Sequence, residues 1–194
     1  MTDTAAIFEC DRYVMLPSVL KEPELGRFHR YACQTAQKGG MRWGDAQVPG
    51  TPCAGGDFIM DGLLTSLLSE IERASGLGLF PTYSYFRVYK PGDMLARHTD
   101  WPSCEISVTL CLGFEGRQSW PIWIEGPRGT SSFNLEPGDA LLYRGTECEH
   151  WREVFEGQRQ AQVFLHYVDQ TGPHAHLKSD SASVDQWFRP LAKT

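Results

Sequence analysis

The spacing of hydrophobic and polar positions changes along the chain near residue 80. Between Glu22 and Gln37 apolar residues recur at helical spacing, on a face formed by Leu25, Phe28 and Ala32. We predict a second helix between Asp57, which can cap its first turn, and Gly76, which can end it. Its apolar stripe consists of Leu63, Leu64, Leu67, Leu68 and Ile71. A short strand is predicted at Tyr13–Leu16, and residues 39–56 form a Gly- and Pro-rich loop.

From Phe80 onward, short stretches of strand-like residues follow one another. The turn signals between them are Pro91-Gly92, Gly116, residues 126–129, Pro137-Gly138 and Glu156-Gly157. Many short strands with regular turns are typical of a sandwich or barrel. We predict one domain, with a helical support (residues 1–79), a β core (80–170) and a C-terminal tail (171–194) whose Trp187-Phe188 docks on the body.

Composition narrows the possible functions. A hydrophobic fraction of 41% in 194 residues is sufficient for a packed core. The formal net charge of -6 disfavours an electrostatic hold on nucleic acid or on an anionic membrane. The chain shows no export signal and no apolar run of membrane length, and its six cysteines lack zinc-site spacing. We expect a cytoplasmic protein with reduced cysteines.

Two histidines and one aspartate stand out as candidate metal ligands. His98 and Asp100 are two positions apart, so on an extended strand both side chains would point to the same face. His150 would complete the set from another strand. Two imidazoles and one carboxylate form the facial set that holds Fe(II) while leaving coordination positions open. We therefore predict a metal site at these three residues.

Arg159 lies nine positions after His150 and suggests a second component of the site. If Glu156-Gly157 is a two-residue hairpin turn, Val154 pairs with Arg159 and shares a sheet face with it. His150 would share that face at roughly 13 Å along the strand, at about 3.3 Å per residue. A turn one residue longer would reverse this parity. By the same counting, His166 points to the opposite face and is left out of the site.

Residues 80–170 resemble the prolyl-hydroxylase-like branch of the iron(II)- and 2-oxoglutarate-dependent dioxygenases. The resemblance rests on Tyr89-x-x-Gly92, His98-x-Asp100, Pro137-Gly-Asp139, His150 and a basic residue nine positions later. It implies a double-stranded β-helix, or jelly roll, backed by the N-terminal helices. It also implies His98, Asp100 and His150 as iron ligands and Arg159 as the anchor of the far carboxylate of 2-oxoglutarate. Dioxygen would be the other cosubstrate.

The chain departs from the family pattern beside this anchor. Ala161 stands where relatives often carry Ser or Thr, and the segment from Ile106 to Leu112 has no tyrosine. A second hydrogen bond to the carboxylate would therefore come from Tyr89 or, failing that, from Tyr83. On the same strand face, Arg87 is a candidate for substrate binding or for a salt bridge. Trp101, at the rim, is a candidate for stacking on substrate.

The resemblance implies hydroxylation of an unactivated C–H bond in an amino acid, a peptide or protein side chain, or a small metabolite, with succinate and carbon dioxide as coproducts. Asp100 argues against the halogenating relatives, which lack this carboxylate. The alternative is a metal-binding, cupin-like sensor or binding module without turnover. The sequence leaves open the substrate, the oligomeric state and whether residues 39–56 act as a lid.

Overall fold

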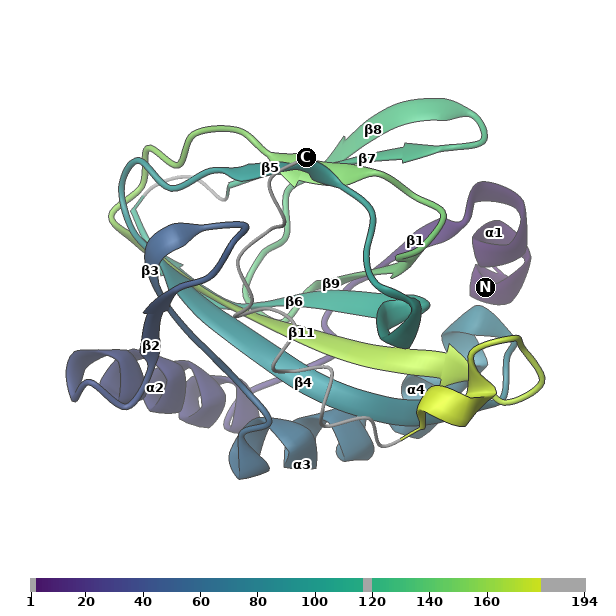
Figure 1. The fold of residues 1–194 in the computed structure, drawn as a ribbon, viewed down its shortest axis with the longest axis horizontal. Helices are drawn as coiled ribbons and strands as arrows, with labels where there is room; N and C mark the ends of the chain where they lie inside the picture. Colours follow the sequence, from purple (N-terminus) through teal and green to yellow (C-terminus); the bar gives the residue numbers. More distant parts are fainter. Residues whose placement is uncertain (1–2, 117–119, 179–194) are drawn as a thin grey trace.

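The computed structural model describes residues 3–116 and 120–178, whose strands form two antiparallel sheets (Figure 1). The larger sheet has the order β1-β9-β6-β11-β4-β3-β2. Its strands are Tyr13–Leu16 (β1), Arg42–Gly44 (β2), Pro49–Gly55 (β3), Leu79–Tyr89 (β4), Ile106–Glu115 (β6), Ala140–Arg144 (β9) and Arg159–Asp169 (β11). The smaller sheet has the order β5-β10-β7-β8 and consists of Leu95–His98 (β5), Ile122–Gly126 (β7), Gly129–Phe133 (β8) and His150–Arg152 (β10). The predicted mainly-β jelly roll is confirmed.

Helices cover the outer face of the larger sheet, as predicted. The α-helices are Thr4–Asp11 (α1), Glu24–Gln37 (α2), Phe58–Ser66 (α3) and Leu68–Ser75 (α4). Figure 1 shows α2 and α3 beneath the long strands, and both helices contact β4 and β11. Asp57 caps α3 by accepting the backbone N–H groups of Ile59 and Met60, and Gly76 ends α4 in the left-handed conformation. The single helix predicted there is interrupted at Leu67.

The long strands of the larger sheet alternate between the helix layer and the interior. On β11 the odd positions, which are Ala161, Val163, Leu165 and Tyr167, belong to the core shared with the helices. On β4 the corresponding residues are Phe86 and Val88. Since neighbouring strand residues point to opposite faces, Gln160, Gln162, Phe164 and His166 face the smaller sheet, together with Tyr83, Tyr85, Arg87 and Tyr89 of β4. The functional site is built between the two sheets.

Two segments differ from the sequence predictions. Residues 39–56 are not one irregular loop, because they contain β2 and β3, which pair with each other and extend the larger sheet beyond β4. The predicted hairpin at Glu156-Gly157 is wrong. Strand β10 ends at Arg152 in the smaller sheet, and β11 begins at Arg159 in the larger one. The chain therefore changes sheets between these strands, and the predicted pairing of Val154 with Arg159 does not form.

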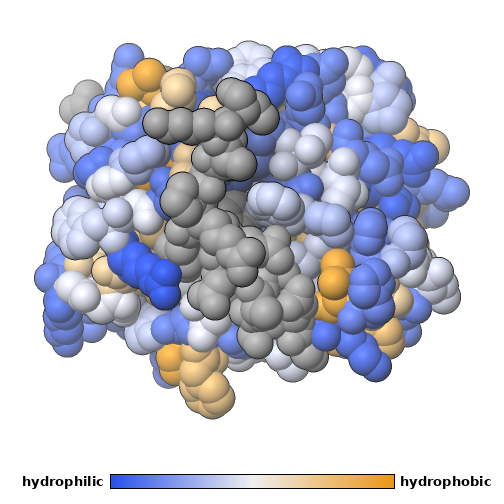
Figure 2. Space-filling model, in the orientation of Figure 1, coloured by the Kyte–Doolittle hydropathy of each residue, from blue (hydrophilic) through white to orange (hydrophobic). Residues whose placement is uncertain are grey.

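The surface carries polar groups over most of the face seen in Figure 1. Figure 2 shows this face as largely hydrophilic, with small and separate apolar patches. In the described part of the chain, no helix is long and apolar enough to span a bilayer. The six cysteines are free thiols, as expected. The predicted docking of Trp187-Phe188 concerns residues outside the described ranges.

Candidate metal centre and its pocket

His98, Asp100 and His150 meet between the two sheets. His98 is the last residue of β5 and His150 the first of β10, and these two residues are direct partners in the antiparallel pairing. The pairing brings the two imidazole centroids to 4.3 Å. Asp100 follows His98 by two positions and turns its carboxylate toward both rings. One possible ligand atom from each side chain lies within 4.8 Å of the others, which is compatible with a single metal ion.

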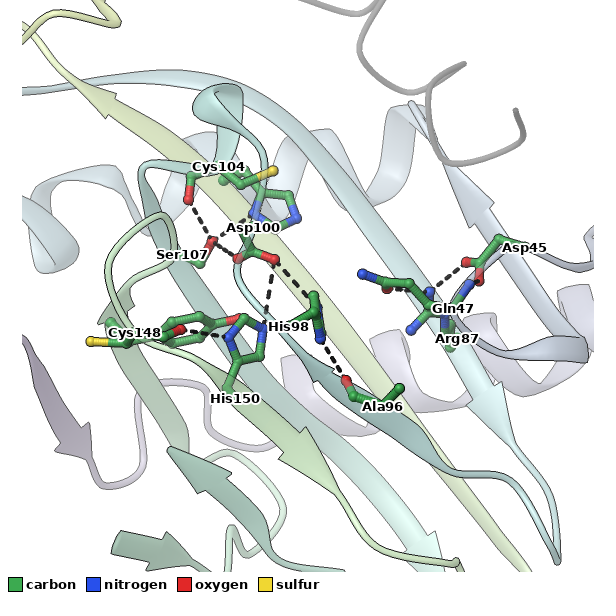
Figure 3. A network of polar contacts seen from close by, with 12 residues as sticks. Asp45, Gln47, Arg87, Ala96, His98, Asp100, Cys104, Ser107, Cys148 and His150 are labelled. Carbon is green, nitrogen blue, oxygen red and sulfur yellow. Dashed lines mark hydrogen bonds and ion pairs between the residues drawn. The ribbon is translucent and has the colours of Figure 1, made fainter. Parts of the chain in front are cut away.

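Hydrogen bonds fix which nitrogen of each histidine faces this centre (Figure 3). Nδ1 of His98 lies 2.8 Å from the carbonyl of Ala96, and Nδ1 of His150 lies 3.0 Å from the carbonyl of Cys148. A carbonyl only accepts, so each Nδ1 carries the proton and each Nε2 keeps its lone pair. The Nε2 atoms lie 3.7 and 3.6 Å from Oδ1 of Asp100. Such second hydrogen bonds are typical of metal-ligating histidines.

Both imidazoles are neutral at physiological pH. Burial, with a smaller contribution from the neighbouring His150, lowers the pKa of His98 to about 4. Burial likewise lowers the pKa of His150 to about 4. Neutral imidazoles are the form that binds a metal ion. The donor set of two imidazoles and one carboxylate therefore fits Fe(II).

The carboxylate of Asp100 is held in one orientation by its surroundings. The backbone N–H of Asp100 donates to the carbonyl of Gly145 at 2.8 Å, and Oδ2 of Asp100 accepts a hydrogen bond from the hydroxyl of Ser107 at 2.7 Å. The hydroxyl oxygen of Ser107 also lies 3.0 Å from Nδ1 of His166. Because Oδ2 is engaged by Ser107, Oδ1 is the oxygen that faces the two histidines.

Replacing Gly145 with alanine is expected to weaken Fe(II) binding by about tenfold or more, because the added methyl group would displace the Asp100 carboxylate. A tenfold loss corresponds to only about 1.4 kcal/mol of binding free energy. A Cβ at this position would lie 2.3 Å from the carbonyl oxygen of Cys104 and 2.5 Å from Oδ2 of Asp100. The measurement is anaerobic Fe(II) titration by calorimetry. The matched control is Gly62→Ala on α3, where a Cβ meets no atom within 4 Å. Equal Fe(II) affinity in both variants would contradict the role given to Gly145.

His166 belongs to the site, contrary to the sequence prediction. The counting placed it correctly on the face opposite Arg159, but the interior face of β11 is the one that carries His166. It is 2% exposed, packs against the ring of Tyr83 at 4.9 Å and lines the pocket beside Asp100. Burial lowers its pKa to about 4. Through Ser107, His166 supports the orientation of Asp100.

A cavity opens beside the metal centre. The volume that a water-sized sphere can occupy in it is about 20 Å³. Besides the three candidate ligands, its lining consists of Gln47, Tyr85, Arg87, Leu95, Tyr143, Phe164 and His166. Arg87 is fully buried and donates to Asp45, to Gln47 at 2.9 Å and to the hydroxyl of Tyr89 at 3.3 Å. Arg87 therefore meets both predictions made from the sequence, because it forms a salt bridge with Asp45 and also lines the pocket.

Arg159 does not reach this pocket. Its parity puts it on the helix side of β11, where its guanidinium pairs with Glu115 at the surface. The expectation that it shares a sheet face with His150 is wrong, because the two residues lie in different sheets. Its positive charge instead contributes to lowering the pKa of His29 on α2, after the larger effect of burial.

A different arginine lies inside the molecule. Arg152 follows His150 by two positions on β10 and is 1% exposed. Its Nη1 donates to the carbonyl of Trp120, whereas Nε and Nη2 are buried without a hydrogen-bond partner. Burial lowers its pKa, and the groups that act in the opposite direction are Tyr89, Cys111 and Tyr143. None of these is a carboxylate, so two buried donors and a cationic charge lack an anionic partner within the described residues.

The remaining predicted site residues are placed as follows. Tyr89 is fully buried, with its ring against Trp120 at 4.8 Å, and it is one of the groups acting on the pKa of Arg152. The hydroxyl of Tyr83 lies 2.9 Å from the thiol of Cys104. Trp101 is 47% exposed and precedes the short 3-10 helix η1, Pro102–Cys104.

Comparisons with known proteins identify the architecture. Neither a protein-family model nor a curated protein sequence matches the chain. Among solved structures, a Pseudomonas putida prolyl-4-hydroxylase superposes with a TM-score of 0.69 at 16% identity, over 86% of this chain and 97% of the other. The α-ketoglutarate-dependent epimerase SnoN from nogalamycin biosynthesis gives 0.73 at 16% identity, over 90% and 87%.

A Trichoplax adhaerens prolyl hydroxylase, solved with a peptide fragment of hypoxia inducible factor, gives a TM-score of 0.71 at 16% identity, over 91% of each chain. Each of the three superpositions covers 86% or more of this chain. The chain therefore has the jelly-roll fold of the 2-oxoglutarate- and Fe(II)-dependent oxygenases.

Proposed function

We propose that this protein is an Fe(II)- and 2-oxoglutarate-dependent oxygenase. The observation that carries the proposal is the combination of the His98, Asp100 and His150 set with the buried guanidinium of Arg152 on the strand of His150, whose Nε and Nη2 lack hydrogen-bond partners among the described residues. A metal-binding module without turnover needs the three ligands but has no use for a buried cation beside them. The fold shared with oxygenases supports this assignment.

The residues present fit both groups. Two imidazoles and a carboxylate leave three positions on Fe(II) open. Arg152 offers two unpartnered donors, and paired guanidinium donors are suited to bidentate recognition of a carboxylate. It stands two residues from His150, about 6.6 Å along the strand, so a five-carbon dicarboxylate held at the metal by one end can reach it with the other. We assign Arg152, with Tyr89 beside it, as the cosubstrate anchor in place of Arg159.

When bound, iron together with 2-oxoglutarate and dioxygen supplies the oxidising power, and the chain supplies position and surroundings. The hydroxyl of Ser107 donates to Oδ2 of Asp100, so that this carboxylate would bind a metal ion through Oδ1 alone and leave the next coordination position free. Leu95 and Phe164 line the pocket with apolar surface that excludes water. Burial raises the pKa of Tyr143, which lies 3.4 Å from Nε2 of His150, so its hydroxyl remains protonated.

The reaction we favour is hydroxylation of a C–H bond in an amino acid, a peptide side chain or a small metabolite, with succinate and carbon dioxide as coproducts. Asp100 supports it because the halogenating relatives lack this carboxylate, so that a halide can bind in its place. The structurally similar prolyl hydroxylase solved with a peptide supports a substrate of peptide or smaller size. Trp101, exposed directly after Asp100, is the residue we propose to stack on substrate at the rim.

Anaerobic titration tests the proposed function directly. Adding 2-oxoglutarate to the Fe(II)-loaded protein is expected to produce a weak visible charge-transfer band, because chelation of ferrous iron by the keto acid gives such a band. The control is His150→Ala, which removes one imidazole and should lose both bound iron and the band. If the wild-type protein binds iron and yet shows no band, the oxygenase assignment fails and the binding-module alternative stands.

A further inference from the structure

The turn between β2 and β3 forms one wall of the pocket. Oδ1 of Asp45 accepts the backbone N–H groups of Gln47 at 2.9 Å and Val48 at 2.8 Å. Its Oδ2 accepts from the hydroxyl of Tyr85 and the guanidinium of Arg87. Val48 is 2% exposed and packs in an apolar cluster with Leu95 and other interior residues. The turn is therefore held against the interior both by hydrogen bonds and by packing, and it forms a fixed wall of the site.

This attachment fixes the orientation of the Gln47 side chain. Oε1 of Gln47 accepts from Nη2 of Arg87 at 2.9 Å. A guanidinium has only donors, so the carboxamide oxygen must face Arg87 and the N–H2 group must face away from it. In Figure 3 the amide end of Gln47 points from Arg87 toward the side where His98 lies. Since Gln47 lines the same cavity as His98 and Asp100, its N–H2 donor is presented to whatever occupies that cavity.

The charges of this wall are balanced internally. Arg87 is matched by Asp45, and both side chains are buried, at 2% and 0% exposure. The other lining residues outside the metal ligands are Tyr85, Leu95, Tyr143, Phe164 and the neutral His166. A charged substrate group entering here would lose its hydration, and among the described lining residues of this wall it would meet no charge that is not already balanced, which is unfavourable. An uncharged group with a hydrogen-bond acceptor meets no such penalty.

We infer that the substrate group entering this pocket is uncharged and presents a carbonyl oxygen, such as that of an amide, to the N–H2 of Gln47. The inference rests on the proposed function, because it concerns the substrate side of the same metal centre. Gln47 is then a residue that touches substrate, whereas Arg87 and Asp45 position it. The inference excludes a free carboxylate as the group recognised at this wall.

The test compares Gln47→Glu with the wild-type protein. Glutamate keeps an oxygen to accept from Arg87 but replaces the N–H2 donor with a second oxygen. The probes are a panel of N-acetyl amino acid N-methylamides and the matched free amino acids. Succinate release is measured together with the gain of one oxygen by mass spectrometry. The control variant is Gln34→Glu, an exposed position on α2.

We expect the blocked amides, and not the free amino acids, to raise succinate release above its substrate-free level. Gln47→Glu should lower kcat/KM for the responding amide by about tenfold or more, the size expected for one lost hydrogen bond that leaves acceptors opposed. The affinity for 2-oxoglutarate, read from the charge-transfer band, should stay within about twofold of wild type, and Gln34→Glu should match wild type in both.

Three results would overturn the inference: stimulation by free amino acids alone, no stimulation by any blocked amide, or an amide response that Gln47→Glu leaves intact. Failure of the proposed function is recognised separately, because the charge-transfer band would then be missing in the wild-type protein before any probe is added.

Discussion

Replacing Arg152 with glutamine is expected to weaken the binding of 2-oxoglutarate by about 30-fold or more, because loss of a buried charge-assisted pair costs about 2–5 kcal/mol. Nε and Nη2 of this arginine are the buried donors that lack partners, and a dicarboxylate would supply the missing acceptors. The measurement is anaerobic titration of the Fe(II)-loaded protein, followed through the charge-transfer band. Iron affinity should be unchanged, since Arg152 is not a ligand.

Two controls separate this effect from damage to the fold. In the absence of 2-oxoglutarate, Arg152→Gln should unfold in urea at a concentration no lower than wild type, because it removes an unpaired buried charge. Arg159→Gln breaks only the surface pair with Glu115, so it should leave 2-oxoglutarate affinity unchanged and alter the free energy of unfolding by less than about 1 kcal/mol. The reverse outcome, with Arg159 and not Arg152 required, would restore the assignment predicted from the sequence.

Replacing Asp45 with asparagine is expected to reduce the free energy of unfolding by about 3–5 kcal/mol, because it removes the negative charge of the buried ion pair between Asp45 and Arg87. Asparagine can still accept the two backbone N–H groups of the turn, so the change acts mainly on the charge pair. The measurement is equilibrium unfolding in urea. Glu115→Gln, which breaks an exposed pair, is the control and should cost less than about 1 kcal/mol.

The ion pair between Asp45 and Arg87 also makes the free energy of unfolding depend on pH. Burial raises the pKa of Asp45, but the Arg87 charge and the Tyr85 hydroxyl lower it more, so the net shift is downward. A carboxylate with a depressed pKa stabilises the fold fully above its unfolded pKa and loses that contribution as pH falls through the folded value. The contribution should therefore be constant near neutrality and disappear below the ordinary aspartate range. A double variant, Arg87→Met with Asp45→Asn, should recover most of the lost stability; a further loss would contradict the pairing.

The three candidate metal ligands were accessible to sequence reasoning because they depend on local geometry. His98 and Asp100 are two positions apart, and the turn signal at Pro91-Gly92 marks the break before β5, which ends at His98. Helix boundaries at Asp57 and Gly76 were equally local, since each residue acts on its own turn of the backbone. What these signals have in common is a short range along the chain.

Arg159 shows where such reasoning ended. Parity can be counted only within one sheet, and the chain leaves the smaller sheet after Arg152 and enters the larger one at Arg159. The rule that paired His98 with Asp100 would have pointed to Arg152, two positions after His150, had it been applied there. Asp45 and Gln47 were hidden for another reason: they lie in a Gly- and Pro-rich stretch whose strands are short and at the sheet edge.

Because His98 and His150 are paired across two strands, a metal ion bound to both would influence how these strands align. Strand β5 is four residues long and lies at the edge of its sheet. Among the described strands it pairs with β10 alone, and His98 stands opposite His150. A slip of β5 by one residue would turn His98 to the other face of the sheet. A bound ion would therefore stabilise only the alignment in which His98 faces His150. Metal coordination would then favour the correct register of β5 in addition to the backbone hydrogen bonds.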